Sequence, residues 1–479
     1  MKKILFVGSE VMPFAATGGL GDVLGSLPKT IAKESADKVE VSVIMPLYNN
    51  VSELWRDKME LVCEYEVTLS WRKLYCGIKR IVSDGVTYYF VDNQYYFYRE
   101  SMYGSFDDGE RFAFFSKAVL DFMRVADYFP NVLHTNDWHS ALVNVYLKTL
   151  YAYDERYSRI KSIFTIHNIE YQGQFDLAII NDVFSFDHYD IPILEYDGRI
   201  NLMKAAIVTA DVVSTVSPRY ADEILESEHS HGLYHILREN KDKLVGILNG
   251  IDYEYYNPLT DKEIAECYSW RSAKRKSKNK KALEEELGLP VMENTPMISI
   301  VSRLASHKGI DLVAGAIYNI VKDNNIQLVI LGKGEGRYED LFCRLQDSFP
   351  EKVRALITYD RALSKRIYAA TDIFLMPSKS EPCGLSQMIA SRYGAIPVVR
   401  ETGGLYDSIK QYREENGKIL GNGITFVDYT AQALSDAVNR ALLLYHDEEK
   451  RRKLISRIMR VDFSWKSSAS KYLELYDII

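Results

Sequence analysis

The string Thr-Gly-Gly-Leu occurs twice in this chain, at residues 17–20 and at residues 402–405. Each copy follows an apolar run typical of a β-strand (residues 4–7 and 396–399) and leads into a stretch with helical patterning. Adjacent glycines at the start of a helix expose backbone N–H groups, which favour a phosphate or another anion. The two copies therefore predict one anionic ligand held between two similar domains, with ordinary turns as the alternative.

Two cations, Arg303 and Lys308, lie in the segment Val-Ser-Arg-Leu-Ala-Ser-His-Lys-Gly at residues 301–309. They fall between the end of a predicted strand and the start of a predicted helix, where open α/β sheets bind their ligands. Together with helix N–H groups, two cations can neutralise a diphosphate leaving group without a metal. The alternative is a solvated loop, which the position at the end of a strand disfavours.

The turn Glu381-Pro382-Cys383-Gly384-Leu385 comes after another apolar run, residues 373–377, and before a helical stretch. Glycine in such a turn lets the backbone approach a ligand closely. A glutamate beside it can accept hydrogen bonds from sugar hydroxyls and stabilise positive charge that develops on an anomeric carbon. A capping glutamate in a structural turn is the alternative.

Polar side chains also follow two strand-like runs in the first half of the chain. His167 ends the run at residues 163–166, and Asp137 lies between His134 and His139 after the run at residues 131–135. No carboxylate pair completes a metal site around these histidines, so hydrogen bonds to sugar hydroxyls fit better than metal ligation. The sequence has no Gly-x-Ser-x-Gly elbow, phosphate-binding P-loop or Gly-x-Gly-x-x-Gly fingerprint, which argues against a serine hydrolase, a kinase and a dehydrogenase.

The composition limits the class of protein further. The chain has 479 residues and a formal net charge of −7, and a nucleic-acid-binding protein is expected to be basic. No apolar run is long enough to span a bilayer. The five cysteines are widely spaced, without a zinc-binding pattern. We therefore expect a cytoplasmic protein with reduced thiols, no metal and no cofactor, which binds neither nucleic acid nor membrane.

Apolar runs that alternate with amphipathic stretches must position these residues. Such alternation is typical of parallel sheets with helical crossovers, so the fold class predicted is α/β. A hairpin-like insertion with an Asp84-Gly85 turn is expected at residues 62–92. The predicted strands are 3–7, 40–45, 131–135, 162–166 and 212–216 in the first half, and 297–304, 327–332, 353–358, 372–377 and 396–400 in the second.

These patterns predict two doubly wound, Rossmann-like domains with a cleft between them. We expect an N-terminal domain at residues 1–248 and a C-terminal domain at residues 249–460. A final helix at residues 461–479, capped by a serine, is expected to return to the first domain. Residues 260–288 are rich in lysine and glutamate, so a solvated surface helix is predicted there.

Taken in order, the motifs resemble those of the bacterial glycogen synthase and plant starch synthase family. The resemblance extends over nearly the whole chain without large insertions, and the ordered set is specific although each motif alone is modest. The matching stretches are residues 17–22, 98–104, 111–117, 137–139, 167–173, 246–252, 302–309, 381–385 and 402–405.

The resemblance implies the two-domain GT-B fold. It also implies transfer of glucose, with retention of configuration, from ADP-glucose to the non-reducing end of an α-1,4-glucan such as glycogen, starch or a maltooligosaccharide. By the same resemblance, Arg303 and Lys308 would hold the diphosphate, and Glu381, His167 and Asp137 would act at the glucosyl group. The residues implied in substrate binding are Gly18, Gly19, Asp22, Tyr98, Asn249, Tyr359 (stacking on the base), Cys383, Gly384, Leu385, Thr402, Gly403 and Gly404.

One residue departs from the family pattern. The family's first glycine motif usually begins with lysine, whereas Ala16 stands at that position here. A cation normally close to the donor phosphates is therefore missing. Weaker or slower use of the donor, or a changed donor preference, is expected.

Three alternatives remain open from the sequence. UDP-glucose is the alternative donor. A sucrose- or trehalose-type synthase of the same fold is disfavoured because many such enzymes carry a second glutamate eight residues after the first, where this chain has Ile389. The loss of the lysine is also compatible with a catalytically reduced homologue that binds glucan, although the retained Glu381, Arg303, Lys308 and His167 argue against it.

Overall fold

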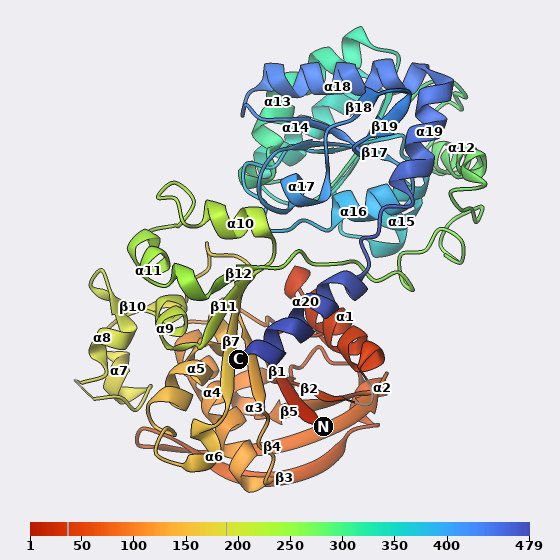
Figure 1. Cartoon of the computed structure of the whole chain (residues 1–479). Helices are drawn as coiled ribbons and strands as arrows, with labels where there is room; N and C mark the ends of the chain where they lie inside the picture. Colours follow the sequence, from red (N-terminus) through yellow and green to blue (C-terminus); the bar gives the residue numbers. More distant parts are fainter. Residues whose placement is uncertain (36–37, 188) are drawn as a thin grey trace. The chain divides into compact units, whose positions relative to one another are not determined.

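The computed structural model describes residues 1–35, 38–187 and 189–479, which form two compact units (Figure 1). The first unit comprises Met1–Gly250 together with Trp465–Ile479, and the second comprises Ile251–Ser464. The chain thus leaves the first unit once and returns to it for its last helix.

A nine-stranded sheet forms the centre of the first unit, in the order β12-β11-β7-β6-β1-β2-β5-β4-β3. All neighbouring pairs are parallel except β5-β4 and β4-β3 at one edge. The expected hairpin with its turn at Asp84 is therefore present, and a further strand extends it at the edge of the main sheet. The strands are β1 (Lys2–Val7), β2 (Val39–Pro46), β3 (Glu60–Leu69), β4 (Arg72–Ser83), β5 (Val86–Asp92), β6 (Val132–Asn136), β7 (Lys161–Ile166), β11 (Val212–Thr215) and β12 (Leu244–Gly246).

Helices surround this sheet, and a small antiparallel sheet of β8 (Gln174–Phe175), β10 (Arg199–Asn201) and β9 (Glu195–Tyr196) lies beyond β7 in the sequence. The central strands are buried: β1 buries its apolar run Ile4–Val7, and β6 buries all five of its residues, including the polar His134, Thr135 and Asn136. The helices are α1 (Gly19–Glu34), α2 (Glu53–Arg56), α3 (Gln94–Phe97), α4 (Asp108–Val125), α5 (Ala141–Lys148), α6 (Glu155–Ser158), α7 (Ile179–Asp182), α8 (Ile191–Leu194), α9 (Leu202–Thr209), α10 (Pro218–Glu223), α11 (Tyr234–Glu239) and α20 (Trp465–Ile478).

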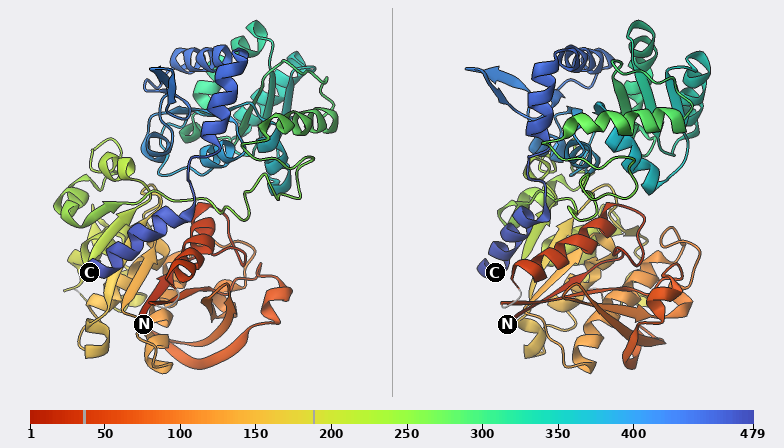
Figure 2. Two further views of the ribbon diagram at one scale, coloured as in Figure 1. Left: turned by 45° about the vertical axis from the view of Figure 1, so that its right-hand side comes forward. Right: turned by 90° about the vertical axis from the view of Figure 1, so that its right-hand side faces the viewer.

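The last helix, α20, is part of the first unit and packs beside α1 (Figure 2). The Tyr476 hydroxyl lies 2.8 Å from Nδ1 of His134, and its ring meets Phe6 edge to face. The Ser468 hydroxyl donates to the carbonyl of Leu248 at 2.5 Å. These contacts are buried, so α20 completes the core of the first unit.

The second unit has a six-stranded parallel sheet in the order β15-β14-β13-β16-β17-β20, with helices between successive strands. A two-stranded hairpin, β18-β19, projects from it (Figure 2, right). The elements are α12 (Lys276–Glu286), β13 (Met297–Val301), α13 (Ile310–Asp323), β14 (Gln327–Leu331), α14 (Gly336–Ser348), β15 (Val353–Leu356), α15 (Arg361–Ala370), β16 (Ile373–Met376), α16 (Ser386–Arg392), β17 (Ile396–Arg400), α17 (Gly403–Ser408), β18 (Arg413–Glu415), β19 (Lys418–Leu420), β20 (Ile424–Phe426), α18 (Ala431–His446) and α19 (Glu448–Ile458). Two α/β domains with parallel sheets confirm the predicted fold class.

A helix is present within residues 260–288, as predicted, but only one face of it is solvated. Helix α12 packs against α15 and buries Lys276 and Lys280. The Lys276 ammonium donates to the carbonyls of Tyr368, Ala369 and Tyr393 at 2.9, 2.8 and 3.0 Å. Desolvation lowers the pKa of Lys276 to about 7. A buried ammonium is tolerated here because backbone carbonyls accept all three of its hydrogen bonds, which a pattern based on charge misses.

No helix in the described ranges combines the length and the apolar character that a bilayer-spanning segment needs.

Candidate active site

In the second unit, the half-buried Lys308 forms an ion pair with the buried carboxylate of Glu381. The Lys308 ammonium lies 2.9 and 2.7 Å from the two carboxylate oxygens of Glu381, and the Ser378 hydroxyl donates to the same carboxylate at 3.0 Å. Glu381 is only 5% exposed. Burial excludes competing water, so this carboxylate is held in one orientation. Ser378 was not among the predicted residues, although it lies three positions before Glu381 in the same loop after β16.

The second Thr-Gly-Gly-Leu loop packs directly on the turn that carries Glu381. A Cβ atom added to Gly403 would lie 2.0 Å from the Glu381 carbonyl oxygen, and one added to Gly404 would lie 2.1 Å from that of Cys383. The Gly404 amide already donates to the carbonyls of Glu381 and Pro382, both at 3.1 Å. The glycines therefore let two loops approach closely, and the amide of Gly404 is engaged within the protein rather than left for an anion.

The remaining residues predicted in the second unit follow the carboxyl ends of neighbouring parallel strands. Arg303 follows β13, Tyr359 follows β15, the turn of Cys383, Gly384 and Leu385 follows β16, and Thr402 follows β17. All of these strand ends meet at one edge of the sheet.

Exposure differs among these residues in a way that bears on ligand binding. Arg303 is exposed and forms no ion pair with any residue that the structure describes. Tyr359 is 75% exposed, and its hydroxyl accepts a hydrogen bond from Arg361 at 2.9 Å. Cys383 and Thr402 are buried. An exposed guanidinium and an exposed ring beside an ion pair can bind a nucleotide without a metal.

In the first unit, the loops after β6 and β7 bring Asp137 and His167 together. A carboxylate oxygen of Asp137 accepts from the backbone amide of His167 at 2.8 Å. Nε2 of the His167 ring lies 2.9 Å from the side-chain oxygen of Asn136. The Asn136 amide nitrogen donates to the carbonyls of Val7 and His134, so its oxygen must face the ring.

This geometry fixes the tautomer of His167. Because Asn136 presents an acceptor, Nε2 carries the proton and Nδ1 keeps its lone pair. Desolvation lowers the pKa of His167 to about 3, so the imidazole is neutral at neutral pH. Nδ1 can therefore accept a hydrogen bond from a sugar hydroxyl. His134 and His139 serve the core instead: His134 bonds Tyr476 and Thr165, and His139 stacks on Trp138.

Asp137 has an unfavourable backbone conformation and a desolvated carboxyl group. Its φ of 54° with ψ of 175° is a backbone conformation that residues other than glycine rarely adopt. Desolvation raises the pKa of its carboxyl to about 7. Strained backbone and shifted pKa values concentrate at functional sites, which favours a role for Asp137 in binding or catalysis.

Asp137→Asn removes the charge and retains the shape. Between about pH 4 and pH 7 the folded wild type binds more protons than the unfolded chain, so the wild-type carboxylate lowers stability as the pH rises through this window. We expect the variant to gain stability relative to wild type between pH 5 and pH 8, by no more than about 4 kcal/mol at 1.36 kcal/mol per pKa unit. Urea unfolding of wild type and variant at pH 5 and at pH 8 measures the difference in their free energies of unfolding. The same difference at the two pH values would contradict the prediction.

The first Thr-Gly-Gly-Leu loop is organised by a carboxylate that the sequence analysis missed. The buried Glu10 accepts hydrogen bonds from the amides of Thr17 and Gly18 at 2.6 and 2.9 Å and from the Thr17 hydroxyl at 2.7 Å. These two amides are therefore occupied. Gly19 then begins α1, and Asp22 lies in its first turn. The only signal in the sequence was an acidic residue directly after an apolar strand.

A cavity of about 650 Å³ lies in the first unit beside Trp138, Tyr171 and Phe175. Tyr171 is 50% exposed, whereas Gln172 is buried and bonds the carbonyls of Ile169 and His231. Gly173 has a φ of +65°, and a Cβ atom there would lie 2.6 Å from the Trp138 ring. Aromatic faces with polar neighbours are typical of sugar-binding surfaces.

Asn249 and Tyr98, two further predicted residues, differ in their exposure to solvent. Asn249 is buried, and its side-chain oxygen has no hydrogen-bond partner among the described residues. Tyr98, directly after α3, is 59% exposed. A buried amide oxygen without a partner is costly, so Asn249 is suited to a ligand.

The described residues contain no group of three or more acidic, histidine or cysteine side chains placed to hold a metal ion.

Comparison with known proteins gives the family. Residues 3–239 match the starch synthase catalytic domain, and residues 282–460 match glycosyl transferases group 1. The chain is 45% identical over 476 residues to a glycogen synthase of Bacillus licheniformis, covering 99% of this chain and 97% of that one. It is 46% identical over 477 residues to a glycogen synthase of Clostridium botulinum, covering 99% and 98%.

A solved structure agrees with these matches. The catalytic domain of starch synthase IV from Arabidopsis thaliana, bound to ADP and acarbose, superimposes with a TM-score of 0.91 at 34% identity, covering 100% of this chain and 99% of that one. A sucrose-phosphate synthase from Thermosynechococcus elongatus, at 17% identity and a TM-score of 0.63, shares the fold alone. The chain belongs to the glycogen synthase and starch synthase family of two-domain glucosyltransferases.

Proposed function

We propose that this protein transfers glucose from ADP-glucose to the non-reducing end of an α-1,4-glucan in the cytoplasm, with retention of configuration. The observation that carries the proposal is the ion pair between Lys308 and the buried Glu381 at the carboxyl edge of the second unit's sheet. The similarity to glycogen synthases over the full chain and to a starch synthase that binds ADP and acarbose supports it.

In the proposed step, the bond between the glucosyl C1 and the diphosphate oxygen breaks while the acceptor O4 forms a bond to C1 on the same face. The acceptor proton passes to the departing diphosphate oxygen. Arg303 and Lys308 stabilise the negative charge on that diphosphate; an ammonium has three N–H donors, and the two bonds to Glu381 leave one of them for the phosphate. Glu381 stabilises the positive charge on C1.

The other predicted residues bind the substrates in this proposal. His167 and Asp137 hold hydroxyls of the glucosyl group, and Tyr359 stacks on the adenine. Gly18, Gly19, Asp22, Asn249 and the loop at residues 402–404 shape the donor site. The aromatic cavity beside Tyr171 binds the glucan acceptor, which is glycogen, starch or a maltooligosaccharide, and Tyr98 contributes to the same acceptor surface.

The decisive experiment measures transfer of radiolabelled glucose to glycogen from ADP-glucose and from UDP-glucose in parallel. We expect ADP-glucose to give the larger kcat/KM. A larger value with UDP-glucose would replace the donor in the proposal. No transfer from either donor at high enzyme concentration would support a glucan-binding protein with reduced catalysis instead.

Ala16 offers a test of the donor site, because the family usually places lysine there. Ala16 is half-buried, and its Cβ would lie 2.3 Å from a Cβ added to Gly21, so it rests against the first turn of α1. We expect Ala16→Lys to raise kcat/KM for ADP-glucose about tenfold, since one added cation near a diphosphate contributes roughly 1–3 kcal/mol. Ala16→Met controls for side-chain length. Equal kinetics of the lysine variant and wild type would refute the effect.

A further inference from the structure

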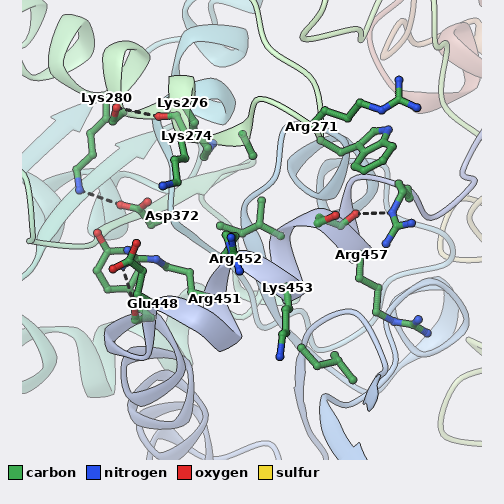
Figure 3. Close-up of a pocket in the computed structure, with 18 of the residues that line it drawn as sticks. Arg271, Lys274, Lys276, Lys280, Asp372, Glu448, Arg451, Arg452, Lys453 and Arg457 are labelled. Carbon is green, nitrogen blue, oxygen red and sulfur yellow. Dashed lines mark hydrogen bonds and ion pairs between the residues drawn. The ribbon is translucent and has the colours of Figure 1, made fainter. Parts of the chain in front are cut away.

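A cavity of about 950 Å³ in the second unit lies away from the residues proposed to bind the donor (Figure 3). Most of the lining comes from three parts of the unit: the segment that leads into α12 with the first turns of that helix, the β18-β19 hairpin, and α19 with the residues that follow it. Glu293, Ala370, Asp372 and Tyr445 complete the lining. In Figure 3, Lys274 from the first of these parts and Arg452 and Lys453 of α19 surround the same hollow. None of the candidate active-site residues belongs to its lining.

The lining is strongly basic. It holds ten lysine and arginine residues but only three carboxylates, Glu293, Asp372 and Glu448. The chain as a whole carries a net charge of −7. Like charges gathered around one hollow repel each other and lower stability, so this concentration of cations in an acidic protein marks a surface suited to an anion.

Some of these cations are committed to the protein itself. Lys276 donates to three carbonyls, Lys280 pairs with Asp372 at 2.9 Å, and Arg457 donates to the carbonyl of Gly421 at 2.6 Å. These bonds hold the three side chains in fixed positions in the lining. A ligand would therefore be bound by other lysine and arginine side chains of the lining.

Three cations are not committed in this way. Lys274, Lys418 and Arg452 are exposed and line the cavity, and none of them forms an ion pair with a residue in the described ranges. They come from three different elements. An anion with several charged groups would bridge all three, whereas an anion with one charged group would contact fewer of them.

Trp270, one of the two aromatic residues in the lining, limits the class of ligand. The guanidinium groups of Arg271 and Arg460 lie 4.7 and 4.9 Å from the centre of the Trp270 ring. The ring is therefore already stacked with cations, which disfavours a nucleobase there. Arginine forks match phosphate oxygens two at a time, so the same groups favour phosphate.

We propose that this cavity binds a small molecule that carries two or more phosphate groups and no nucleobase. The site is separate from the donor site, and the ligand bridges the segment before α12, strand β19 and helix α19 through Lys274, Lys418 and Arg452. Both a bisphosphorylated sugar and a short inorganic polyphosphate present this chemistry.

Isothermal titration of the full chain with inorganic tripolyphosphate, in 150 mM salt and with saturating ADP to occupy the donor site, tests the proposal. We expect the double variant Lys274→Ala/Arg452→Ala to bind at least tenfold more weakly than wild type. The matched control Lys322→Ala/Arg344→Ala removes one exposed lysine and one exposed arginine outside the cavity, and it should bind within twofold of wild type. No binding to wild type at millimolar tripolyphosphate, or equal weakening in the two double variants, would overturn the site.

Fructose 1,6-bisphosphate and glucose 6-phosphate, titrated in the same way, distinguish the sources of phosphate. Tighter binding of fructose 1,6-bisphosphate than of tripolyphosphate assigns the site to a sugar bisphosphate, and the reverse assigns it to polyphosphate. Glucose 6-phosphate should bind at least tenfold more weakly than the tighter of the two. Equal binding of all three would contradict the requirement for more than one phosphate. Thermal unfolding should give both double variants a midpoint close to that of wild type, because exposed side chains contribute little to stability.

Discussion

Glu381→Gln is expected to lower kcat for glucosyl transfer by roughly 100- to 1000-fold, the effect of removing one aligned electrostatic group from an active site. Glutamine keeps the size and the hydrogen bond from Ser378 but lacks the charge proposed to stabilise C1. ADP affinity should stay within about threefold of wild type, because the carboxylate acts on the sugar. Initial rates with ADP-glucose and titration with ADP measure the two quantities.

Glu286→Gln is the matched control for this variant. Glu286 also forms an ion pair within the second unit, at 3.0 Å from Arg366, but on the surface of α12. It should leave kcat unchanged. A kcat of Glu381→Gln within threefold of wild type, or an ADP affinity that falls as far as kcat does, would show that Glu381 has a different role.

Lys276→Met is expected to lower the free energy of unfolding of the second unit by about 3 kcal/mol or more. The substitution removes the ammonium from three buried carbonyls. The Tyr393 carbonyl keeps its hydrogen bond from the Tyr268 hydroxyl, whereas those of Tyr368 and Ala369 lose the bond from Lys276, and each buried group left without a partner costs about 1–3 kcal/mol. Methionine retains most of the volume, so cavity formation contributes little. Urea unfolding followed by far-ultraviolet circular dichroism measures the change.

The same helix provides a control. Lys278 is 64% exposed and pairs with Glu266 at 3.3 Å. Lys278→Met should change stability by less than about 1 kcal/mol, as surface ion pairs do. If the two variants unfolded at the same urea concentration, the buried hydrogen bonds of Lys276 would not hold α12 in place.

The sequence predicted the parallel strands well because continuous apolar runs have few alternatives to a buried strand. The run at residues 327–332, for example, corresponds to β14 at Gln327–Leu331. It did not predict the buried face of α12, where backbone carbonyls accept the hydrogen bonds of the Lys276 ammonium. The residues of one sheet edge were also predictable, since each follows a strand of the same parallel sheet.

Contacts between residues far apart in the sequence were harder to predict from the sequence. Lys308 and Glu381 were both selected, but nothing in their types showed that a separation of 73 residues closes into an ion pair. Glu10 was missed because its importance comes from the amides that it meets, and backbone donors are identical in every residue. The sequence predicts ligand binding by the glycines of the second loop, which stays a prediction; it did not show that their missing Cβ atoms also make room for the carbonyls of a neighbouring loop.

The return of α20 to the first unit has a consequence for how the chain folds during synthesis. The contact between Tyr476 and His134 joins residues 342 positions apart, so the first unit lacks one of its core helices until residues 465–478 have been synthesised. The second unit, Ile251–Ser464, is contiguous, and all of it emerges from the ribosome before that helix does. Domains of a nascent chain usually mature from the N-terminus onward. Here the order is reversed: the unit that is made first is the last to be completed.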